Sequence, residues 1–217
     1  MAKGKIREFS RAEKDRASRI IKKLQKEYPE AECSLKYRNP FELLIAVVLS
    51  AQCTDKKVNA VLPSLFTKFP DAKRMAVANI RSLENAIKTL GLYRSKAKNI
   101  REIARITQGR VPDDMQELQA LPGVGRKTSN VVLTEIFHRA EGIAVDTHCR
   151  RLSMRLGLTA FDDPIKIEKD LMNLFSQGKW HLVTHHFIAH GREVCKAPRP
   201  LCDTCILRSV CTYPKQQ

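Results

Sequence analysis

The sequence contains no apolar stretch long enough to cross a membrane. Its longest apolar run, Phe41 to Ala51, is interrupted by Glu42, whereas a helix that spans the bilayer needs about 20 apolar residues. The N-terminal segment MAKGKIREFSRAEKDRASRIIKKL is charged and has neither the apolar core nor the small-residue cleavage site of a secretory signal. The sequence therefore predicts a soluble cytoplasmic protein with no membrane partner, although a basic N-terminus would also suit a mitochondrial or nuclear destination.

Acidic residues are scarce relative to basic ones. The 217 residues include 23 Asp and Glu against 39 Lys and Arg, which gives a formal net charge of +16. Such an excess of positive charge on a chain of globular composition favours a polyanionic partner, nucleic acid above all. A solubilising surface, a ribosomal protein and a membrane-surface protein are the alternatives that charge alone leaves open.

Alternating strand patterns are also missing, as are long-period repeats and low-complexity linkers. The best strand candidate, GIAVD at 142–146, is short, and apolar residues elsewhere recur at helical spacing. We therefore expect an all-α protein in which Pro63 kinks or breaks its helix. The expected helices cover residues 11–29, 39–52, 54–70, 75–79, 82–90, 94–107, 126–137, 147–156, 165–175 and 181–191.

Four of the seven cysteines gather near the C-terminus in CKAPRPLCDTCILRSVC. They are Cys195, Cys202, Cys205 and Cys211, spaced C-x6-C-x2-C-x5-C. Because no export signal is present, two disulfides are disfavoured, and four thiolates in one loop indicate a metal centre. Only Cys202 and Cys205 are closely spaced, and longer segments of six and five residues separate them from Cys195 and Cys211. This spacing favours a four-iron cluster over a structural zinc ion, which is the rival metal. The scattered Cys33, Cys53 and Cys149 are expected to be small buried side chains.

The segment LPGVGRKTSN joins two expected helices through Gly123 and Gly125. Glycines permit backbone conformations that other residues avoid, and the free N–H groups of such a turn and of the following helix form a cradle for phosphate. Arg126 and Lys127 open that following helix at its positive end. An ordinary helix–helix turn is the alternative, and the basic composition of the chain favours the phosphate cradle.

Lys127 has two chemical interpretations. The helix N-terminus and cations such as Arg126, Arg150 or Arg151 disfavour a protonated amine, and a buried position would disfavour it further. A neutral amine is a nucleophile that can form a Schiff base with an aldehyde carbon. The other interpretation is a lysine that simply pairs with phosphate, and the residue alone does not decide between them.

Asp146, in GIAVDTHCRR, follows an apolar run and precedes an expected helix. It is therefore expected to cap that helix with its carboxylate. Hydrogen bonds from the first turn would keep the carboxylate ionised, so that it could stabilise a cationic sugar or move protons. The capping role and the catalytic role are compatible. The neighbouring His148 is expected to orient a group or to contact phosphate.

The order LPGVGRKTSN, then VDTH, then C-x6-C-x2-C-x5-C resembles that of the helix-hairpin-helix base-excision DNA glycosylases, specifically the endonuclease III family. The resemblance extends from NPFELLIAVVLSAQCTD to Cys211. It implies an all-α, two-lobed fold with DNA across the cleft between the lobes. One lobe is a six-helix barrel domain at 33–140, with the helix-hairpin-helix at about 113–137. The other is a discontinuous helical domain at 1–32 and 141–217, with the cluster loop at 195–211.

The same resemblance implies roles for individual residues. Lys127 matches the Schiff-base lysine, Asp146 the catalytic aspartate, and the four C-terminal cysteines the ligands of a [4Fe–4S] cluster. The hairpin Leu121–Gly125 matches the phosphate-binding hairpin, which in relatives also holds a monovalent cation through backbone carbonyls. Gln52 alone would be interpreted as an amide at the end of a helix, and Leu92 alone as a core leucine. By the resemblance, both match residues that enter the DNA. The implied DNA-contacting residues are Gln52, Leu92, Gly123, Gly125, Arg126, Thr128, His148, Lys196 and Arg199.

The function that the resemblance implies is a bifunctional DNA glycosylase and AP lyase of base excision repair. Such an enzyme removes oxidised pyrimidines from double-stranded DNA and cleaves the strand 3′ of the abasic site by β-elimination through a lysine Schiff base. We expect it to act as a monomer associated with the nucleoid. In this reading the cluster is structural and holds Lys196 and Arg199 against the phosphates.

Related and unrelated alternatives remain. An adenine glycosylase of the same superfamily lacks the lysine and continues into a further recognition domain, whereas here Lys127 is present and six residues follow Cys211. An 8-oxoguanine glycosylase commonly has no cluster. The alternatives from other classes are a DNA-binding module without catalysis and a basic zinc protein.

Overall fold

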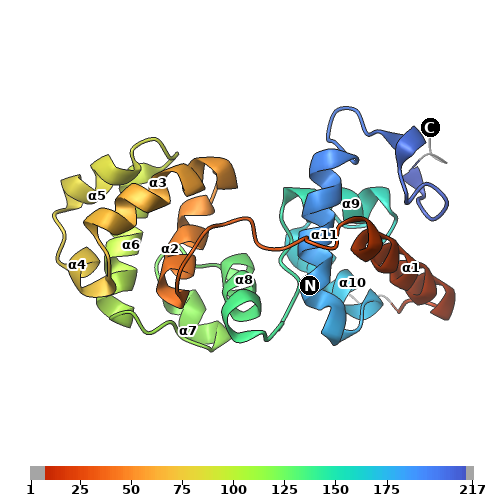
Figure 1. The fold of residues 1–217 in the computed structure, drawn as a ribbon. Coiled ribbons are helices and arrows are strands. Elements are labelled where there is room, and N and C mark those ends of the chain that lie inside the picture. The colour runs from red at the N-terminus through yellow and green to blue at the C-terminus, as the bar shows by residue number, and fades with distance from the viewer. Residues whose placement is uncertain (1–7, 214–217) are drawn as a thin grey trace. The chain divides into compact units, whose positions relative to one another are not determined.

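The computed structural model describes residues 8 to 213, and within this range it contains helices and no strand (Figure 1). The all-α prediction is confirmed, and GIAVD is not a strand. The chain divides into two compact units, residues 34–139 and the described parts of 1–33 and 140–217. The outer ends of the expected discontinuous domain, 1–7 and 214–217, lie outside the described residues, as does the start of the charged N-terminal segment.

The unit of residues 34–139 is built around α2 (Pro40–Ser50), in which every residue from Phe41 to Leu49 is buried. A helix that is apolar on all sides needs partners all round. Here α2 contacts α3 (Asp55–Lys68), α6 (Tyr93–Thr107) and α8 (Arg126–Phe137). The unit is completed by α4 (Ala72–Ala76), α5 (Ile80–Ile87) and α7 (Met115–Ala120), which packs against α8.

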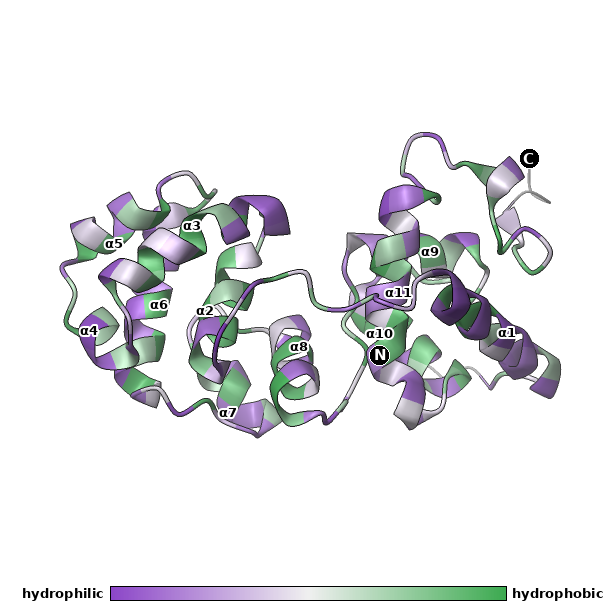
Figure 2. Cartoon of the chain, viewed as in Figure 1, coloured by the Kyte–Doolittle hydropathy of each residue, from purple (hydrophilic) through white to green (hydrophobic). Residues whose placement is uncertain are grey.

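The other unit combines the N-terminal helix with the C-terminal third of the chain. Its helices are α1 (Arg11–Glu27), α9 (Thr147–Arg155), α10 (Pro164–Leu174) and α11 (Trp180–Glu193), with short 3₁₀ turns at Gln177–Lys179 and Cys202–Thr204. Figure 2 shows α1 dominated by hydrophilic residues, yet one apolar stripe of α1 is buried. That stripe shares a core with α9, α11 and Leu207 of the cluster loop, residues 195–211. Burial therefore joins the two ends of the chain.

Local signals explain most helix boundaries, and tertiary packing explains one exception. Pro63 does not break its helix, because α3 continues from Asp55 to Lys68. Proline removes one intrahelical hydrogen bond, but the buried residues Val58, Leu62 and Leu65 hold both halves of α3 in the same core. The described residues contain no helix whose length and apolar character would let it cross a membrane.

Two short helices begin earlier than the sequence predicts. α4 starts at Ala72 and α5 at Ile80, three and two residues before the predicted starts. Each start is set by a capping side chain: Asp71 Oδ1 accepts the Arg74 N–H at 2.8 Å, and Asn79 Oδ1 accepts the Arg81 N–H at 2.9 Å. Apolar periodicity predicts later starts, and the capping side chains decide the boundaries.

Candidate functional site

The turn between α7 and α8 depends on one glycine. The Leu121 carbonyl accepts a hydrogen bond from the Val124 N–H at 3.1 Å, and Gly123 between them has a φ of +78°. A Cβ atom at Gly123 would also lie 2.4 Å from the Nδ2 atom of Asn99 on α6. The left-handed backbone favours glycine here, and any side chain would also have to displace the Asn99 amide. The glycine therefore fixes how the chain enters α8.

Gly125 serves a different purpose, since nothing inside the unit requires a glycine there. Its φ of −102° is open to any residue, and a Cβ atom would meet no other atom within 4 Å. Gly125 is the N-cap residue of α8 and has no side chain with which to cap the helix. No N-cap side chain occupies the start of α8, and the exposed glycine leaves room for an external acceptor to reach the backbone of the first turn.

Lys127 lies in the first turn of α8, directly after the hairpin. Its side chain is exposed within its unit, as is that of Arg126, while Thr128 is half-buried. The sequence did not decide whether Lys127 is buried, and the structure places the amine at the surface of its unit. An exposed primary amine therefore stands beside the uncapped, positive end of a helix, where an anionic ligand would bind.

Gln52 and Leu92 share an unusual backbone conformation. Their φ angles are 55° and 58°, in the left-handed region that non-glycine residues seldom occupy. Both side chains are exposed, and 59% of the Leu92 surface is accessible. Leu92 is therefore not a core residue, and the unit holds two side chains outward at some conformational cost.

Asp146 is the N-cap residue of α9, as predicted. Its Oδ1 atom accepts the Cys149 N–H at 2.7 Å, and within the described chain its Oδ2 atom accepts no hydrogen bond. His148 is half-buried, and its Nδ1 atom lies 3.1 Å from an Arg151 guanidinium nitrogen. Because the guanidinium can only donate, Nδ1 accepts this bond. Burial lowers the pKa of His148, so the imidazole is neutral near pH 7.

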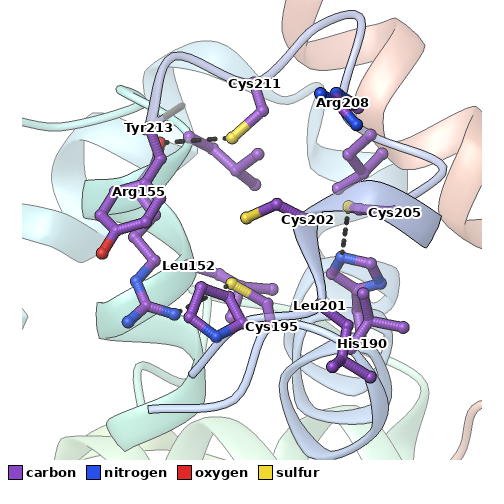
Figure 3. Close-up of a pocket in the computed structure, with 14 residues that line it drawn as sticks. Leu152, Arg155, His190, Cys195, Leu201, Cys202, Cys205, Arg208, Cys211 and Tyr213 are labelled. Atoms are coloured by element: carbon purple, nitrogen blue, oxygen red, sulfur yellow. Dashed lines mark hydrogen bonds between the residues drawn. The ribbon is translucent and has the colours of Figure 1, made fainter. Parts of the chain in front are cut away.

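The four cysteines of the C-terminal motif line one pocket (Figure 3). Its walls come from α9, α11 and the cluster loop, and they include apolar side chains such as Leu152 and Leu201. In Figure 3 the sulfurs of Cys195, Cys202 and Cys211 point into the same space. The spacing C-x6-C-x2-C-x5-C thus brings its thiols together at one place in the fold.

The chemistry of this pocket fits a metal centre with four thiolate ligands. Burial raises the pKa of Cys205 and of Cys211, and the neighbouring cysteines raise both further. Four thiolates in this pocket would repel one another unless a cation compensates their charge. The lining of the pocket therefore fits a cationic centre held by the four cysteines.

Two arginines of α9 hold the start of the cluster loop. Arg155 donates to the carbonyl of Lys196 and to that of Ala197, both at 2.7 Å, and Arg151 Nε donates to the Cys195 carbonyl at 3.0 Å. The acceptors in these hydrogen bonds are backbone carbonyls of the loop, so the basic side chains of the loop take no part in them. Lys196 and Arg199 are both exposed, so the loop presents two positive charges to solvent.

Sequence reasoning missed two partners of cysteines. His190 is buried; its Nε2 atom lies 3.4 Å from Cys205 Sγ, and its Nδ1 atom lies 3.1 Å from the Tyr28 hydroxyl. Burial lowers the pKa of His190 to about 4, so it is a neutral hydrogen-bonding residue. Cys53 accepts a hydrogen bond from Lys96. Only contacts between distant parts of the chain identify either pair, and no local motif points to them.

The scattered cysteines differ from the prediction in part. Cys149 is buried in the core of its unit, as expected. Cys33 and Cys53 are half-buried, so the prediction that they are buried was wrong for these two. Cys33 lies in the segment between α1 and α2, and Cys53 lies in the short connection between α2 and α3.

Comparison with known proteins gives consistent results. Residues 45–177 match the model of the HhH-GPD superfamily base excision DNA repair protein family. An endonuclease III of Synechocystis sp. is 50% identical over 204 residues, which cover 92% of this chain and 93% of that relative. An endonuclease III of Bacillus subtilis is 45% identical over 85% of this chain and 86% of its own length.

Solved structures agree with the sequence relatives. A trapped endonuclease III–DNA covalent intermediate is similar with a TM-score of 0.88 and 43% identity, covering 94% of this chain and 97% of that one. A non-covalent endonuclease III–DNA complex gives the same values. A thermostable thymine-DNA glycosylase, 21% identical with a TM-score of 0.82, is similar in fold over 95% of this chain.

Proposed function

Because the chain belongs to the HhH-GPD superfamily of base excision DNA repair proteins, we propose a stepwise DNA chemistry for its candidate site. The protein is a base excision repair DNA glycosylase and AP lyase of the endonuclease III type. Its proposed substrate is double-stranded DNA with an oxidised pyrimidine or an abasic site, bound by a single chain on the cytoplasmic nucleoid. The observation that carries the proposal is α8, which begins at an exposed glycine and presents an exposed Lys127 in its first turn.

In this proposal Lys127 is the nucleophile. The damaged base leaves the helical stack, at a cost of a few kcal/mol that is least for a damaged base. Lys127 Nζ bonds to the deoxyribose C1′ as the bond from C1′ to the base breaks, and the base leaves with a proton. The sugar ring opens, and the nitrogen and C1′ form a Schiff base. Loss of the now acidic C2′ proton expels the 3′ phosphate by β-elimination, which cuts the strand.

Asp146 is proposed to remain ionised and to stabilise the positive charge that develops on the sugar, with a second role in proton transfer. What supports this is its fixed position, since the Cys149 N–H holds one carboxylate oxygen and leaves the other for substrate. His148 is proposed to orient the substrate by a hydrogen bond, because a neutral imidazole brings no charge.

The hairpin is proposed to bind DNA phosphates without reading the base sequence. The N–H groups of the first turn of α8, from Gly125 to Thr128, supply donors, and Arg126 supplies charge. Backbone carbonyls of the hairpin would also hold a monovalent cation in this proposal. Gln52 and Leu92 are proposed to enter the duplex, Gln52 filling the space of the flipped nucleotide and Leu92 acting as a wedge.

The C-terminal pocket is proposed to hold a [4Fe–4S] cluster through Cys195, Cys202, Cys205 and Cys211. The cluster would supply the positive charge that four half-buried thiolates need, and it would fix the cluster loop as a structural element. The loop in turn presents Lys196 to the DNA phosphates. We propose this arrangement as the second DNA-binding surface, on the unit formed by the described parts of residues 1–33 and 140–217.

The function is tested with duplexes that contain thymine glycol, dihydrouracil, uracil, a pyrimidine dimer or an abasic site. We expect base release from the oxidised pyrimidines, strand cleavage at the abasic site, and a covalent adduct when borohydride is present. Binding without base release or adduct would support a DNA-binding module instead. Release of an undamaged adenine opposite a damaged base, without strand cleavage, would support an adenine glycosylase.

Two glycine-to-alanine variants should separate the two roles of the hairpin. Gly123→Ala forces a left-handed alanine against Asn99 and should lower the free energy of unfolding by about 1–2 kcal/mol. Gly125→Ala meets no atom within 4 Å and should change it by less than about 1 kcal/mol. DNA affinity should nevertheless fall about tenfold in Gly125→Ala, because the methyl group stands where phosphate approaches. Denaturant unfolding and fluorescence anisotropy measure the two effects, and unchanged DNA affinity in Gly125→Ala would contradict the cradle.

Replacing Asp146 by asparagine should separate charge from capping. Asparagine caps a helix about as well as aspartate, so the free energy of unfolding should change by less than about 0.5 kcal/mol. The single-turnover rate of base release should fall about 100-fold or more, because the charge is lost. Asp163→Asn is the matched control, since Asp163 caps α10 in the same unit through the Lys166 N–H at 2.9 Å. An Asp146→Asn enzyme as fast as this control would remove Asp146 from the mechanism.

A further inference from the structure

Left-handed backbone is uncommon at non-glycine residues, and at Leu92 it is not explained by the end of a helix. Among the described residues, the four non-glycine positions with positive φ are Gln52, Leu92, Gln108 and His138. Gln108 and His138 end α6 and α8, where a left-handed residue is an ordinary helix stop. Gln52 directly follows Ala51, the C-cap residue of α2, whereas Leu92 is the N-cap residue of α6. Both residues have exposed side chains. They are also the two residues proposed above to enter the duplex.

One contact links the segments that carry these two residues. Lys96 Nζ donates a hydrogen bond to Cys53 Sγ at 3.2 Å. Cys53 directly follows Gln52, and Lys96 lies one helical turn after Leu92, whose carbonyl accepts the Lys96 N–H at 3.0 Å. The sulfur also packs against this second segment, because a Cβ atom at Gly91 would lie 4.0 Å from it. We call residues 51–54 and 90–93 the wedge loops.

The energetics of Lys96 argue against a purely structural role. Only 3% of its surface is exposed, and within the described chain Cys53 Sγ is the only acceptor that its amine reaches. A buried amine with one weak sulfur acceptor is a poor source of stability, and an apolar side chain of similar length would pack there at lower cost. A residue that costs stability at this place is better explained by the position it imposes on its neighbours.

We propose that Cys53 and Lys96 are a positioning pair that couples the two wedge loops, so that Gln52 and Leu92 enter damaged DNA together. This inference rests on the proposed function. Neither residue touches the reacting atoms. The hydrogen bond holds the left-handed conformation of each loop in register with the other, and its loss leaves either loop free to relax to the ordinary right-handed region.

The test follows base extrusion directly. A duplex carries 2-aminopurine beside the lesion, and stopped-flow fluorescence reports the unstacking that follows binding. Lys96→Met keeps the length of the side chain and removes the amine, and Cys53→Ala removes the acceptor. We expect each variant to slow the fluorescence rise and the single-turnover base release about fivefold to tenfold. The double variant should be no slower than Lys96→Met. Adduct formation at a ready-made abasic site, where no base is extruded, should change less than about twofold.

The controls separate positioning from folding and from charge. Cys53→Ser keeps an acceptor and should restore at least about half of the wild-type rate. Lys98→Met removes one charge from an exposed position of α6 and should leave extrusion unchanged, while thermal melting verifies that each variant is folded. The proposed role of the pair would be overturned if folded Lys96→Met protein extruded the base at the wild-type rate. It would also be overturned if Cys53→Ser were as slow as Cys53→Ala. A wild-type protein with neither fluorescence change nor adduct would instead overturn the proposed function.

Discussion

Replacing Lys127 by alanine is expected to abolish the covalent adduct that borohydride traps between this protein and abasic DNA. The adduct requires an amine that forms a Schiff base with C1′, and alanine has none. Base release and strand cleavage should both fall by at least about 10³-fold, the scale of losing the nucleophile of an enzyme. Because Lys127 is exposed within its unit, its removal should leave the free energy of unfolding within about 0.5 kcal/mol of wild type. Gel electrophoresis after borohydride treatment gives the measurement.

Arg126→Ala is the matched control, because it removes a cation from the same exposed helix start. It should weaken DNA binding and lower the slope of log affinity against log salt by about 1, as expected for one lost phosphate contact. At saturating enzyme it should still form the adduct at a rate close to wild type. If Arg126→Ala lost the adduct as completely as Lys127→Ala, or if Lys127→Ala kept it, the amine of Lys127 would not be the nucleophile.

The parts of the fold that the sequence predicted are those set by local chemistry. The apolar run at 40–50 gave the buried helix α2, and Asp146 caps α9 as its position before THCRR indicated. The glycines of LPGVG gave the turn before α8, although only the structure separates Gly123, which the fold requires, from Gly125, which it does not. The distinction depends on the neighbouring Asn99, and a single sequence does not reveal that neighbour.

The parts that sequence reasoning missed depend on contacts between distant residues. Lys96 and Cys53 are 43 positions apart, and a lysine in an amphipathic helix is ordinarily assigned to the exposed face. His190 is one of several histidines in α11, and only the fold places it between Tyr28 and Cys205. Pro63 shows the converse, because a local rule predicted a kink or a break, and the packing of α3 keeps the helix continuous across Pro63. Burial in the folded chain therefore determines side-chain contacts and helix continuity that the local sequence pattern does not determine.

Replacing Cys202 by serine is expected to remove the cluster and to open the cluster loop. Wild-type protein should be yellow-brown and contain about four irons per chain, whereas Cys202→Ser should lose most of the iron and the visible absorbance. Apart from a 3₁₀ turn at 202–204, the loop has little regular structure, so we expect its order to depend on the proposed cluster and on the arginines of α9. The free energy of unfolding should fall by at least about 4 kcal/mol, as for loss of a structural metal. Iron analysis and denaturant unfolding measure these effects.

Two comparisons show what the cluster contributes. Cys33→Ser changes a half-buried cysteine outside the pocket and should keep all of the iron. A Lys196→Ala, Arg199→Ala double variant should keep the iron too, but lower the salt slope of DNA binding by about 2. If the cluster serves only to present these two charges, Cys202→Ser that still folds should lose about as much affinity as the double variant. A larger loss of DNA affinity in Cys202→Ser would mean that the ordered loop also shapes the unit that carries Asp146. A colourless wild-type protein that contains one zinc ion would refute the cluster itself.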